Sequence, residues 1–248
     1  RFASSARIFE ATGSVWAVRS SELYPKVDER VTRVLFKAQD KVKKGQLLVQ
    51  QDDRQQQLAL RLAKVQMENT KSLLARYQQA VAKGAVPQSQ VDSAQAEFDA
   101  ARLAVEQAEL DIELRQIRAP FDGVVGISRV DPGQRIAPGV LITGVDDRRV
   151  MYIDFEVPEA LVPTLKSASE GSVSLKARTV AIPGRSYDAK VTELDNRLDA
   201  MKRTLLVRAE IDNADDLIRP GMSFVMTLDV PGEQLPTVPE LALQWDRQ

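Results

Sequence analysis

The feature that most constrains the fold of this chain is a β-type pattern that occurs twice, 94 positions apart. The first copy ends with the sequence VKKGQLLVQQDD at residues 42–53. The second copy lies at the end of the stretch formed by residues 118–147. A repeat of this kind predicts one folding unit that is built from two similar halves. The matched pairs are Val31 with Val125, Val42 with Ile136, Gly45 with Gly139, Leu47 with Leu141, Leu48 with Ile142, Asp52 with Asp146 and Asp53 with Asp147.

Each copy alternates apolar and polar residues over short spans that are interrupted by glycine-containing turns. This pattern predicts short strands joined by tight turns, because glycine readily adopts the positive φ that such turns need. Two such copies can pack face to face as a small β-sandwich. The alternative is two unrelated hairpins that share a turn sequence. The turn glycines that we expect are Gly45, Gly123, Gly133 and Gly139.

The segment between the copies predicts an antiparallel helical hairpin. Apolar or small residues recur at steps of three and four over residues 60–81 and again over residues 91–112. Spacing of this kind, sustained over about four heptads in each arm, is typical of a coiled coil about 40 Å long. The seam residues that we expect include Leu60, Met67, Leu74, Tyr77, Val91, Phe98, Val105 and Ile112.

The sequence KGAVPQSQVD at residues 83–92 separates the two arms. Gly84 can end the first helix, Pro87 lies near the start of the second, and Ser89 is a candidate cap. A hairpin inserted into a split β-domain buries little beyond its own seam. This favours a role in contacting another molecule, with a purely structural spacer as the alternative.

The region after residue 150 predicts a second β-domain. Five or six short alternating segments, separated by polar or Gly/Pro turns, indicate an antiparallel barrel or sandwich. A short helix is expected at residues 158–165, and Pro220-Gly221 is expected to form a turn.

The composition excludes several classes of function. The 248 residues include neither histidine nor cysteine, so the commonest ligands of soft metals and the usual nucleophile and base of hydrolases are absent. The 34 basic residues are balanced by 35 acidic ones, which gives no net field favouring nucleic acid. No stretch approaches the roughly 20 consecutive apolar residues of a membrane-spanning helix. We therefore expect a non-enzyme with no cofactor, no metal site and no nucleic-acid partner.

Two pairs of aspartates could be interpreted as a metal site or as paired catalytic carboxylates. Asp52 and Asp53, however, lie at the expected start of the first helix, where acidic side chains cap free amides. Asp146 and Asp147 are expected in a turn that leads into the second β-domain. The glycines of GQRIAPG, residues 133–139, do not form a phosphate loop, because no Gly-Lys-Ser/Thr follows.

The stretch IRAPFDGVVGISRVDPGQRIAPG, residues 117–139, resembles the signature of periplasmic adaptor proteins, also called membrane fusion proteins. In that family a lipoyl-like domain is divided by an α-helical hairpin. Residues 187–228, which include the run NADDLIRPGM, resemble the β-barrel domain of the same family. Among adaptors, the short hairpin and this barrel are most similar to those of resistance-nodulation-division (RND) efflux pumps.

The resemblance implies a mostly β, elongated, multidomain chain with an inserted coiled-coil hairpin. The implied parts are N-terminal strands at residues 1–19, lipoyl-like halves at 20–52 and 117–147, the hairpin at 53–116, a β-barrel at 148–232, and the start of a membrane-proximal domain at 233–248.

The resemblance also implies a function. Such an adaptor links an inner-membrane RND transporter to an outer-membrane channel of the TolC type for the export of drugs or other solutes. It associates with itself into a trimeric or hexameric ring. It lies in the periplasm of a Gram-negative bacterium, anchored to the inner membrane by a segment outside this chain.

Other partners and classes stay open at this point. The adaptor could serve a type I secretion system, another ATP-driven transporter or a heavy-metal pump. A lipoyl or biotinyl carrier shares the split sandwich, but it needs an exposed lysine at the turn where this chain has its helices.

The resemblance places channel recognition at the hairpin tip. Family adaptors often show an arginine, a leucine four residues later and a serine seven residues beyond that. Counted from Arg76, these positions fall on Ala80 and Pro87, so only the arginine matches. The planar guanidinium of Arg76 suits channel carbonyls or carboxylates, with a solvated helix arginine as the alternative. The tip residues expected to bind the channel are Arg76, Ala80, Gly84, Pro87 and Ser89.

The first half-motif departs from the family at two positions. Glu29 and Gln39 stand where glycine is usual, opposite Gly123 and Gly133 in the repeat. We expect looser turns at these two positions.

Overall fold

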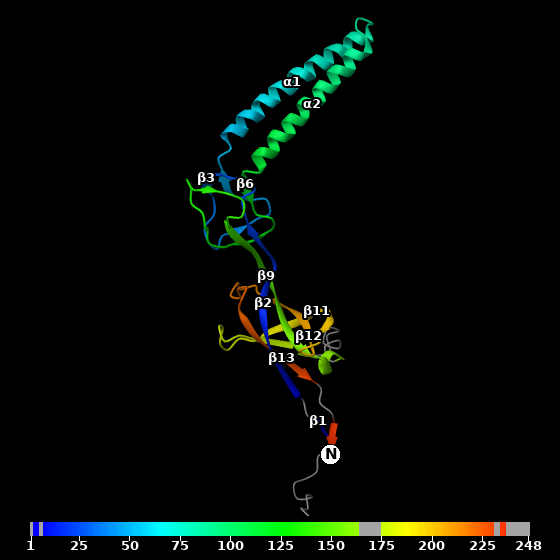
Figure 1. Cartoon of the computed structure of the whole chain (residues 1–248). Helices are drawn as coiled ribbons and strands as arrows, with labels where there is room; N and C mark the ends of the chain where they lie inside the picture. The colour runs from blue at the N-terminus through cyan, green and yellow to red at the C-terminus, as the bar shows by residue number, and fades with distance from the viewer. Residues whose placement is uncertain (1, 5–6, 164–174, 231–233, 237–248) are drawn as a thin grey trace, which may run out of the picture. The chain divides into compact units, whose positions relative to one another are not determined.

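The structure is a computed structural model that describes residues 2–4, 7–163, 175–230 and 234–236 (Figure 1). The chain divides into two compact units, a barrel unit of Arg1–Ser20 with Asp146–Gln248 and a sandwich unit of Ser21–Val145. The divisions fall within two long strands, β2 (Arg7–Leu23) and β9 (Thr143–Pro158). The predicted fold class is confirmed as mostly β with an inserted helical hairpin.

The two halves of the sandwich unit pair with each other according to the repeat. Glu29 pairs with Ile136, and the equivalent residues 94 positions away, Gly123 and Val42, also pair. The four-stranded sheet has the order β6-β5-β3-β8, and β4 pairs with β7. The strands are β3 (Glu29–Val34), β4 (Lys41–Val42), β5 (Leu47–Gln51), β6 (Gln116–Arg118), β7 (Gly123–Val125) and β8 (Arg135–Ile136).

The core of the sandwich also follows the repeat. The apolar side chains that the two halves contribute at equivalent positions are buried in one cluster. The buried pairs are Leu23 with Ile117, Val31 with Val125, Phe36 with Val130, Val42 with Ile136, and Leu48 with Ile142. A sandwich core of this size needs both halves, so neither β-motif can bury its apolar face alone.

The turns agree with the predicted glycines at three of four positions. Gly45, Gly133 and Gly139 have φ of 80°, 91° and 95°. The prediction for Gly123 is wrong, because this residue pairs in strand β7 and has no positive φ.

The expected loosening at Glu29 and Gln39 is also wrong. Glu29 begins strand β3, as Gly123 begins β7. Gln39 adopts φ 72°, close to that of Gly133, and its N–H donates to the carbonyl of Val125 at 2.9 Å. The equivalent bond from Gly133 to Val31 measures 2.8 Å, so the strand pairing holds glutamine in a conformation that glycine adopts more easily.

Two antiparallel helices connect the halves of the sandwich. Helix α1 (Arg54–Ala82) and helix α2 (Gln88–Glu113) lie side by side (Figure 1). Strands β5 and β6, which flank the hairpin in sequence, pair with each other, with Val49 opposite Ile117. The root of the hairpin is therefore held by a β-ladder. Among the residues that the structure describes, neither helix combines the length and apolar character needed to cross a membrane.

The barrel unit is a closed antiparallel sheet. Its strand order is β12-β11-β10-β13-β2-β9, and β9 pairs back to β12. Closure leaves these strands without a free edge. The core includes Phe155, Val207 and Phe224. The remaining elements of this unit are η1 (Glu159–Leu161), β10 (Leu175–Arg178), β11 (Tyr187–Asp199), β12 (Thr204–Asp212) and β13 (Ser223–Val230).

The chain ends add one short pairing, in which β1 (Phe2–Ser4) runs antiparallel to β14 (Gln234–Pro236). Apart from β14, the segment predicted as a membrane-proximal domain, residues 233–248, lies outside the described residues. The short helix η1 falls within the expected residues 158–165, of which 164 and 165 are not described.

Candidate functional site

The hairpin seam determines where the tip lies. Of the eight seam residues that the spacing indicates, Leu74, Val91, Val105 and Ile112 are buried, and the other four are half-buried. The other four are Leu60, Met67, Tyr77 and Phe98. Alanines at 94, 101 and 108 are also buried, which lets the helices approach closely. Near the tip, Leu74, Val91 and Ala94 form a cluster with Tyr77, Val81 and Phe98.

The first helix ends in a Schellman motif that Gly84 makes possible. The N–H of Gly84 donates to the carbonyl of Val81 at 2.9 Å, and the N–H of Ala85 donates to the carbonyl of Ala80 at 2.9 Å. Gly84 has φ 69°, the left-handed conformation that this motif requires. Ala80 thus helps to build the turn through its carbonyl, and its side chain is half-buried.

The second helix begins two residues earlier than a Ser89 cap would require. Pro87 is the N-cap, with φ −72° and ψ 152°, and Gln88 is the first helical residue. The prediction of Ser89 as a cap is therefore wrong, because proline at 87 already fixes the entry into the helix. Ser89 is exposed inside the first turn, and its carbonyl accepts the hydroxyl of Ser93 at 2.9 Å.

Arg76 lies on α1, two helical turns before Gly84, and its side chain is exposed. Among the described residues, no hydrogen bond or ion pair of its guanidinium is found. Gly84, Pro87 and Ser89 are also exposed, so the structure brings these three together around the turn, with Arg76 further down the helix. An arginine of this kind can offer its full set of N–H donors to another molecule.

At the root of the hairpin, the predicted capping of free amides is made by Asp52 and not by the side chain of Asp53. Asp53 is the N-cap of α1 but makes no side-chain cap bond, and its carboxylate accepts the side-chain amide of Gln57 at 3.2 Å. Asp52 accepts the backbone N–H of Arg54 at 3.2 Å and its Nε–H at 2.9 Å. These bonds from Arg54 lower the pKa of Asp52 to about 2.

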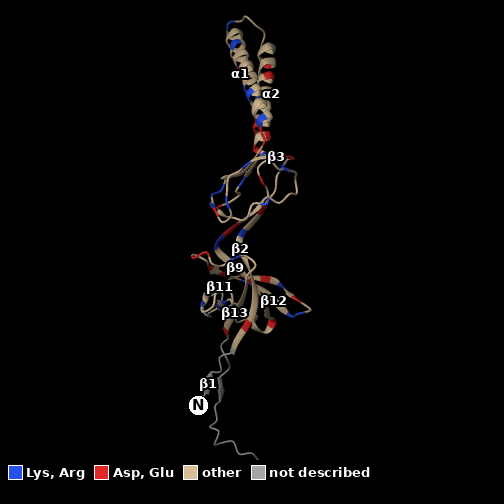
Figure 2. Cartoon of the chain, turned by 90° about the vertical axis from the view of Figure 1, so that its left-hand side faces the viewer, with Lys and Arg blue, Asp and Glu red and all other residues tan. Residues whose placement is uncertain are grey.

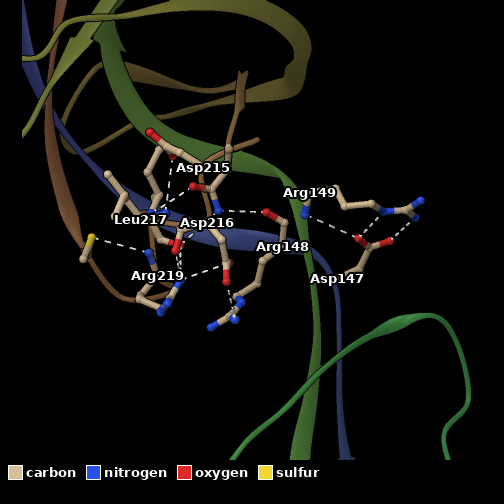
Figure 3. Close-up of polar contacts among 10 residues, drawn as sticks. Asp147, Arg148, Arg149, Asp215, Asp216, Leu217 and Arg219 are labelled. Atoms are coloured by element: carbon tan, nitrogen blue, oxygen red, sulfur yellow. Dashed lines mark hydrogen bonds and ion pairs between the residues drawn. The ribbon is translucent and has the colours of Figure 1, made fainter. Parts of the chain in front are cut away.

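In the second copy, the prediction of a turn at Asp146 and Asp147 is wrong, because both residues lie in strand β9. Asp147 is buried, and the guanidinium of Arg149 donates to its two oxygens at 2.9 and 2.8 Å (Figure 3). This pairing holds the pKa of Asp147 below its usual value. Within the described parts of the chain, no group of three acidic residues is placed to hold a metal ion.

Next to Asp147, a buried polar network fastens the run NADDLIRPGM to β9 (Figure 3). Asn213 is buried and brackets two segments: its side-chain amide donates to the carbonyls of Arg148 and Ile218 at 2.8 and 3.1 Å, and its oxygen accepts the N–H of Ile218 at 2.9 Å. Arg148 pairs with Asp216 at 3.0 Å, which in turn contacts Arg219 at 3.0 Å. The role of Asn213 is not predictable from the sequence, because an asparagine after a strand indicates only a turn.

The turn at Pro220-Gly221 has the structure that the sequence indicates. The N–H of Met222 donates to the carbonyl of Arg219 at 3.2 Å, and Gly221 has φ 87°. Proline followed by a glycine with positive φ is the pattern of a type II turn. The run that carries the resemblance therefore has a structural role in the barrel.

Two family models match the chain. Residues 19–143 match the RND membrane fusion protein barrel-sandwich hybrid domain, and residues 151–232 match the CusB-like beta-barrel domain.

Similar proteins cover nearly the whole chain. The multidrug resistance protein MdtA of Klebsiella pneumoniae subsp. pneumoniae is 30% identical over 260 residues, which cover 96% of this chain. An uncharacterized protein of Haemophilus influenzae is 27% identical over 241 residues, with the same coverage. The chain spans 62% of the length of each of these relatives.

Solved structures share the fold. A MacA-MexA chimeric protein that contains the Pseudomonas aeruginosa MexA alpha-hairpin domain has a TM-score of 0.80 at 23% identity, covering 93% of this chain and 81% of the chimera. A putative efflux transporter from Bacteroides eggerthii has a TM-score of 0.74 at 23% identity, covering 99% of this chain and 78% of the other.

Proposed function

The chain belongs to the RND membrane fusion protein family, and on that premise we propose that it is a non-catalytic periplasmic adaptor. In this role it links an inner-membrane RND transporter to an outer-membrane channel of the TolC type. The exported solutes are drugs or similar compounds, in keeping with the name of the relative MdtA, a multidrug resistance protein.

The observation that carries the proposal is the insertion of the hairpin into the split sandwich. Its root is tied by the β5–β6 ladder, while its tip presents Gly84, Pro87 and Ser89 to solvent. A rigid arm with an exposed tip and a small core of its own is suited to contact a partner at a distance.

In this proposal each part has a mechanical task. The hairpin tip recognises the channel, with Arg76 donating hydrogen bonds to carbonyl or carboxylate oxygens of the channel. The sandwich and barrel units associate with other copies into a trimeric or hexameric ring on the transporter, in the periplasm of a Gram-negative cell. The adaptor catalyses no reaction. It seals the path that exported solutes follow from the transporter to the channel, and it transmits movements of the transporter to the channel.

Site-directed crosslinking from the tip tests this proposal. The chain has no cysteine, so Gln88→Cys in the full-length protein gives one reactive thiol at the start of α2. We expect crosslinking in cell envelopes, followed by purification, to recover an outer-membrane channel on this thiol together with an RND transporter. Arg76→Ala in the same protein should lower the yield of the channel adduct.

A matched control has its thiol at the other end of the same helix. Gln107→Cys is also exposed, but it lies near the root of the hairpin and should give no channel adduct. Equal channel adducts from both positions would contradict recognition by the tip. Recovery of an ATP-driven transporter in place of an RND transporter would support the alternative of a secretion-type adaptor.

A further inference from the structure

The two helices of the hairpin carry opposite charge. Helix α1 has five basic residues and one acidic residue, whereas α2 has one basic and seven acidic residues. Figure 2 shows the same division, with basic residues along α1 and acidic residues along α2. Because the whole chain has a net charge of only −1, this is a separation of charge within the hairpin.

The charges are arranged in rows along the helices. Acidic residues occur every seventh position on α2, at Asp92, Asp99, Glu106 and Glu113. On α1, Arg54 and Arg61 are also seven residues apart. Seven residues make close to two helical turns, so each row runs along one side of its helix.

Each helix also has a second apolar stripe that the hairpin does not bury. Five side chains in the half of the hairpin nearer its root are 48–64% exposed, and they are Leu58, Leu62, Val65, Leu103 and Leu110. Val65 is two residues from both Ala63 and Met67 of the seam, which is about 200° around the helix. The stripes thus point away from the seam, on what we call the outer faces of α1 and α2.

The two stripes lie at the same level of the hairpin. Lys64 on α1 pairs with Glu109 on α2 at 3.0 Å, which fixes the register of the helices. Leu62 and Leu110 each lie within one turn of that pair. Exposed apolar stripes bordered by charge are typical of protein–protein contacts.

We propose that the outer face of α1 docks against the outer face of α2 in a second copy of this chain. Leu58, Leu62 and Val65 of one copy would cover Leu103 and Leu110 of the next. The two basic residues of the row on α1, Arg54 and Arg61, would face the acidic row of the neighbouring copy. The proposal rests on the proposed function, because it adds a contact between hairpins to the ring that the sandwich and barrel units form.

Charge determines which faces can meet. Contact between two α1 faces brings like basic charges together, and contact between two α2 faces brings like acidic charges together, so both are disfavoured. The α1–α2 contact is heterologous: each copy uses one face for each neighbour, which is the kind of contact that a closed ring of identical copies needs. Opposite rows at the edge of an apolar contact provide orientation and partner selection.

Two full-length chains with different tags test the contact, one carrying Leu62→Cys and the other Leu110→Cys. When they are mixed and treated with a short bis-maleimide, we expect crosslinks between differently tagged chains at several times the yield from either chain alone. Crosslinks that form mainly between two Leu62→Cys chains, or no crosslinks at all, would overturn the proposal.

Charge reversal makes the test specific. Arg61→Glu in the Leu62→Cys chain should lower the yield several-fold, and Glu106→Lys in the Leu110→Cys chain should restore it, whereas Arg54 is left unchanged because it is bonded to Asp52 of its own chain. Lys71→Glu is the matched control: it stands seven residues after Lys64, on the side that faces α2 of its own hairpin, and should change the yield less than twofold. An equal loss with Lys71→Glu would overturn the electrostatic part of the proposal.

The two proposals can fail separately. If Gln88→Cys still recovers a channel and an RND transporter while Leu62→Cys and Leu110→Cys never crosslink, the adaptor function stands and the docking faces are wrong. If the crosslinks form but no channel or transporter is recovered, the chain assembles through these faces without the proposed bridging role.

Discussion

The sandwich and the hairpin both consist of two halves, but the relation between the halves is opposite in the two regions. In the sandwich, equivalent residues of the two copies make the same hydrogen bonds and bury the same positions. In the hairpin, the two helices share one seam but carry opposite charge on their surfaces. The two halves of the sandwich are therefore matched through the core that they share, whereas the two helices of the hairpin differ in the charges that they expose to solvent.

The difference shows which contacts tolerate a change of sequence. At Gln39 and Gly133, two very different residues take the same turn conformation, because the strand pairing around them is the same. In the hairpin, by contrast, the seam holds residues from alanine to phenylalanine, and the two helices differ most in the charges that they expose.

The largest expected effect tests the symmetry of the sandwich core. Leu48→Ala and Ile142→Ala, at equivalent and fully buried positions, should each lower the free energy of unfolding by about 3 kcal/mol. Leu74→Ala in the hairpin seam should cost about 2 kcal/mol, because that seam is narrow and open to solvent. Urea denaturation followed by circular dichroism measures all three. Leu62→Ala, on the exposed outer face of α1, is the control and should stay within about 0.5 kcal/mol of the parent.

The next effect concerns a pair of equivalent positions at which the two halves of the repeat differ in structure. Asp147 and Asp53 are equivalent in the repeat, but only Asp147 is buried and bonded to a guanidinium. Asp147→Asn should cost about 1.5 kcal/mol at pH 7, since it weakens two charge-assisted hydrogen bonds. Asp53→Asn should be nearly neutral, because Asp53 makes no side-chain cap bond and asparagine is an equally good N-cap.

The same pair gives a test in acid. The pKa of Asp147 is lowered in the folded state, so its contribution is complete above the unfolded pKa of about 3.9 and is lost as the pH falls through the folded value. The Tm difference between the parent and Asp147→Asn should therefore shrink below about pH 4. A difference that stays constant down to pH 2 would show that the charge of Asp147 contributes nothing.

A smaller effect compares the two turn conformations directly. Gly133→Gln should destabilise the sandwich by about 1 kcal/mol, because glutamine in the left-handed region is strained. A Cβ at this position would meet no other atom within 4 Å, so no steric clash adds to that cost. Gln39→Gly should have the opposite sign and a smaller size, since relief of strain is offset by the greater flexibility of glycine in the unfolded chain. Equal signs for the two changes in thermal denaturation would break the proposed equivalence of the turns.

The smallest effect concerns the ion pair between the helices. Lys64→Gln removes the contact with Glu109, and both side chains are about half exposed. We expect a loss below about 0.5 kcal/mol in urea denaturation. A loss above 1 kcal/mol would mean that charge stabilises the hairpin itself, which would weaken the argument that the charges serve contacts between copies.

Much of the fold could be predicted because its signals are periodic. The 94-residue repeat indicated the split sandwich, and steps of three and four indicated the helices, since both patterns reflect which side chains must face a core. The turn at Pro220-Gly221 was also predictable, because proline and glycine restrict the backbone locally.

The parts that could not be predicted depend on contacts between distant residues. Gly123 resembles a turn glycine, but pairing with Val42 places it in a strand. Asp147 resembles a turn residue, but β9 continues through it and supplies Arg149 as its partner. Ser89 is a plausible cap by residue type, but Pro87 is the N-cap, so the helix starts two positions earlier than a Ser89 cap would place it. The buried bracket formed by Asn213 has no sequence signal of its own, because it depends on the carbonyl of Arg148, which lies 65 residues earlier in the chain.

The pairing of β5 with β6 allows the length of the hairpin to change independently of the sandwich below it. Because both ends of the insert leave neighbouring strands, the arms can gain or lose whole heptads without disturbing the strand pairing beneath them. One heptad added to each arm lengthens the reach by about 10 Å. Closing the longer insert costs only about 0.2 kcal/mol of chain entropy. The reach of the hairpin can thus change through the number of heptads alone, while the β-domains keep the same packing requirements.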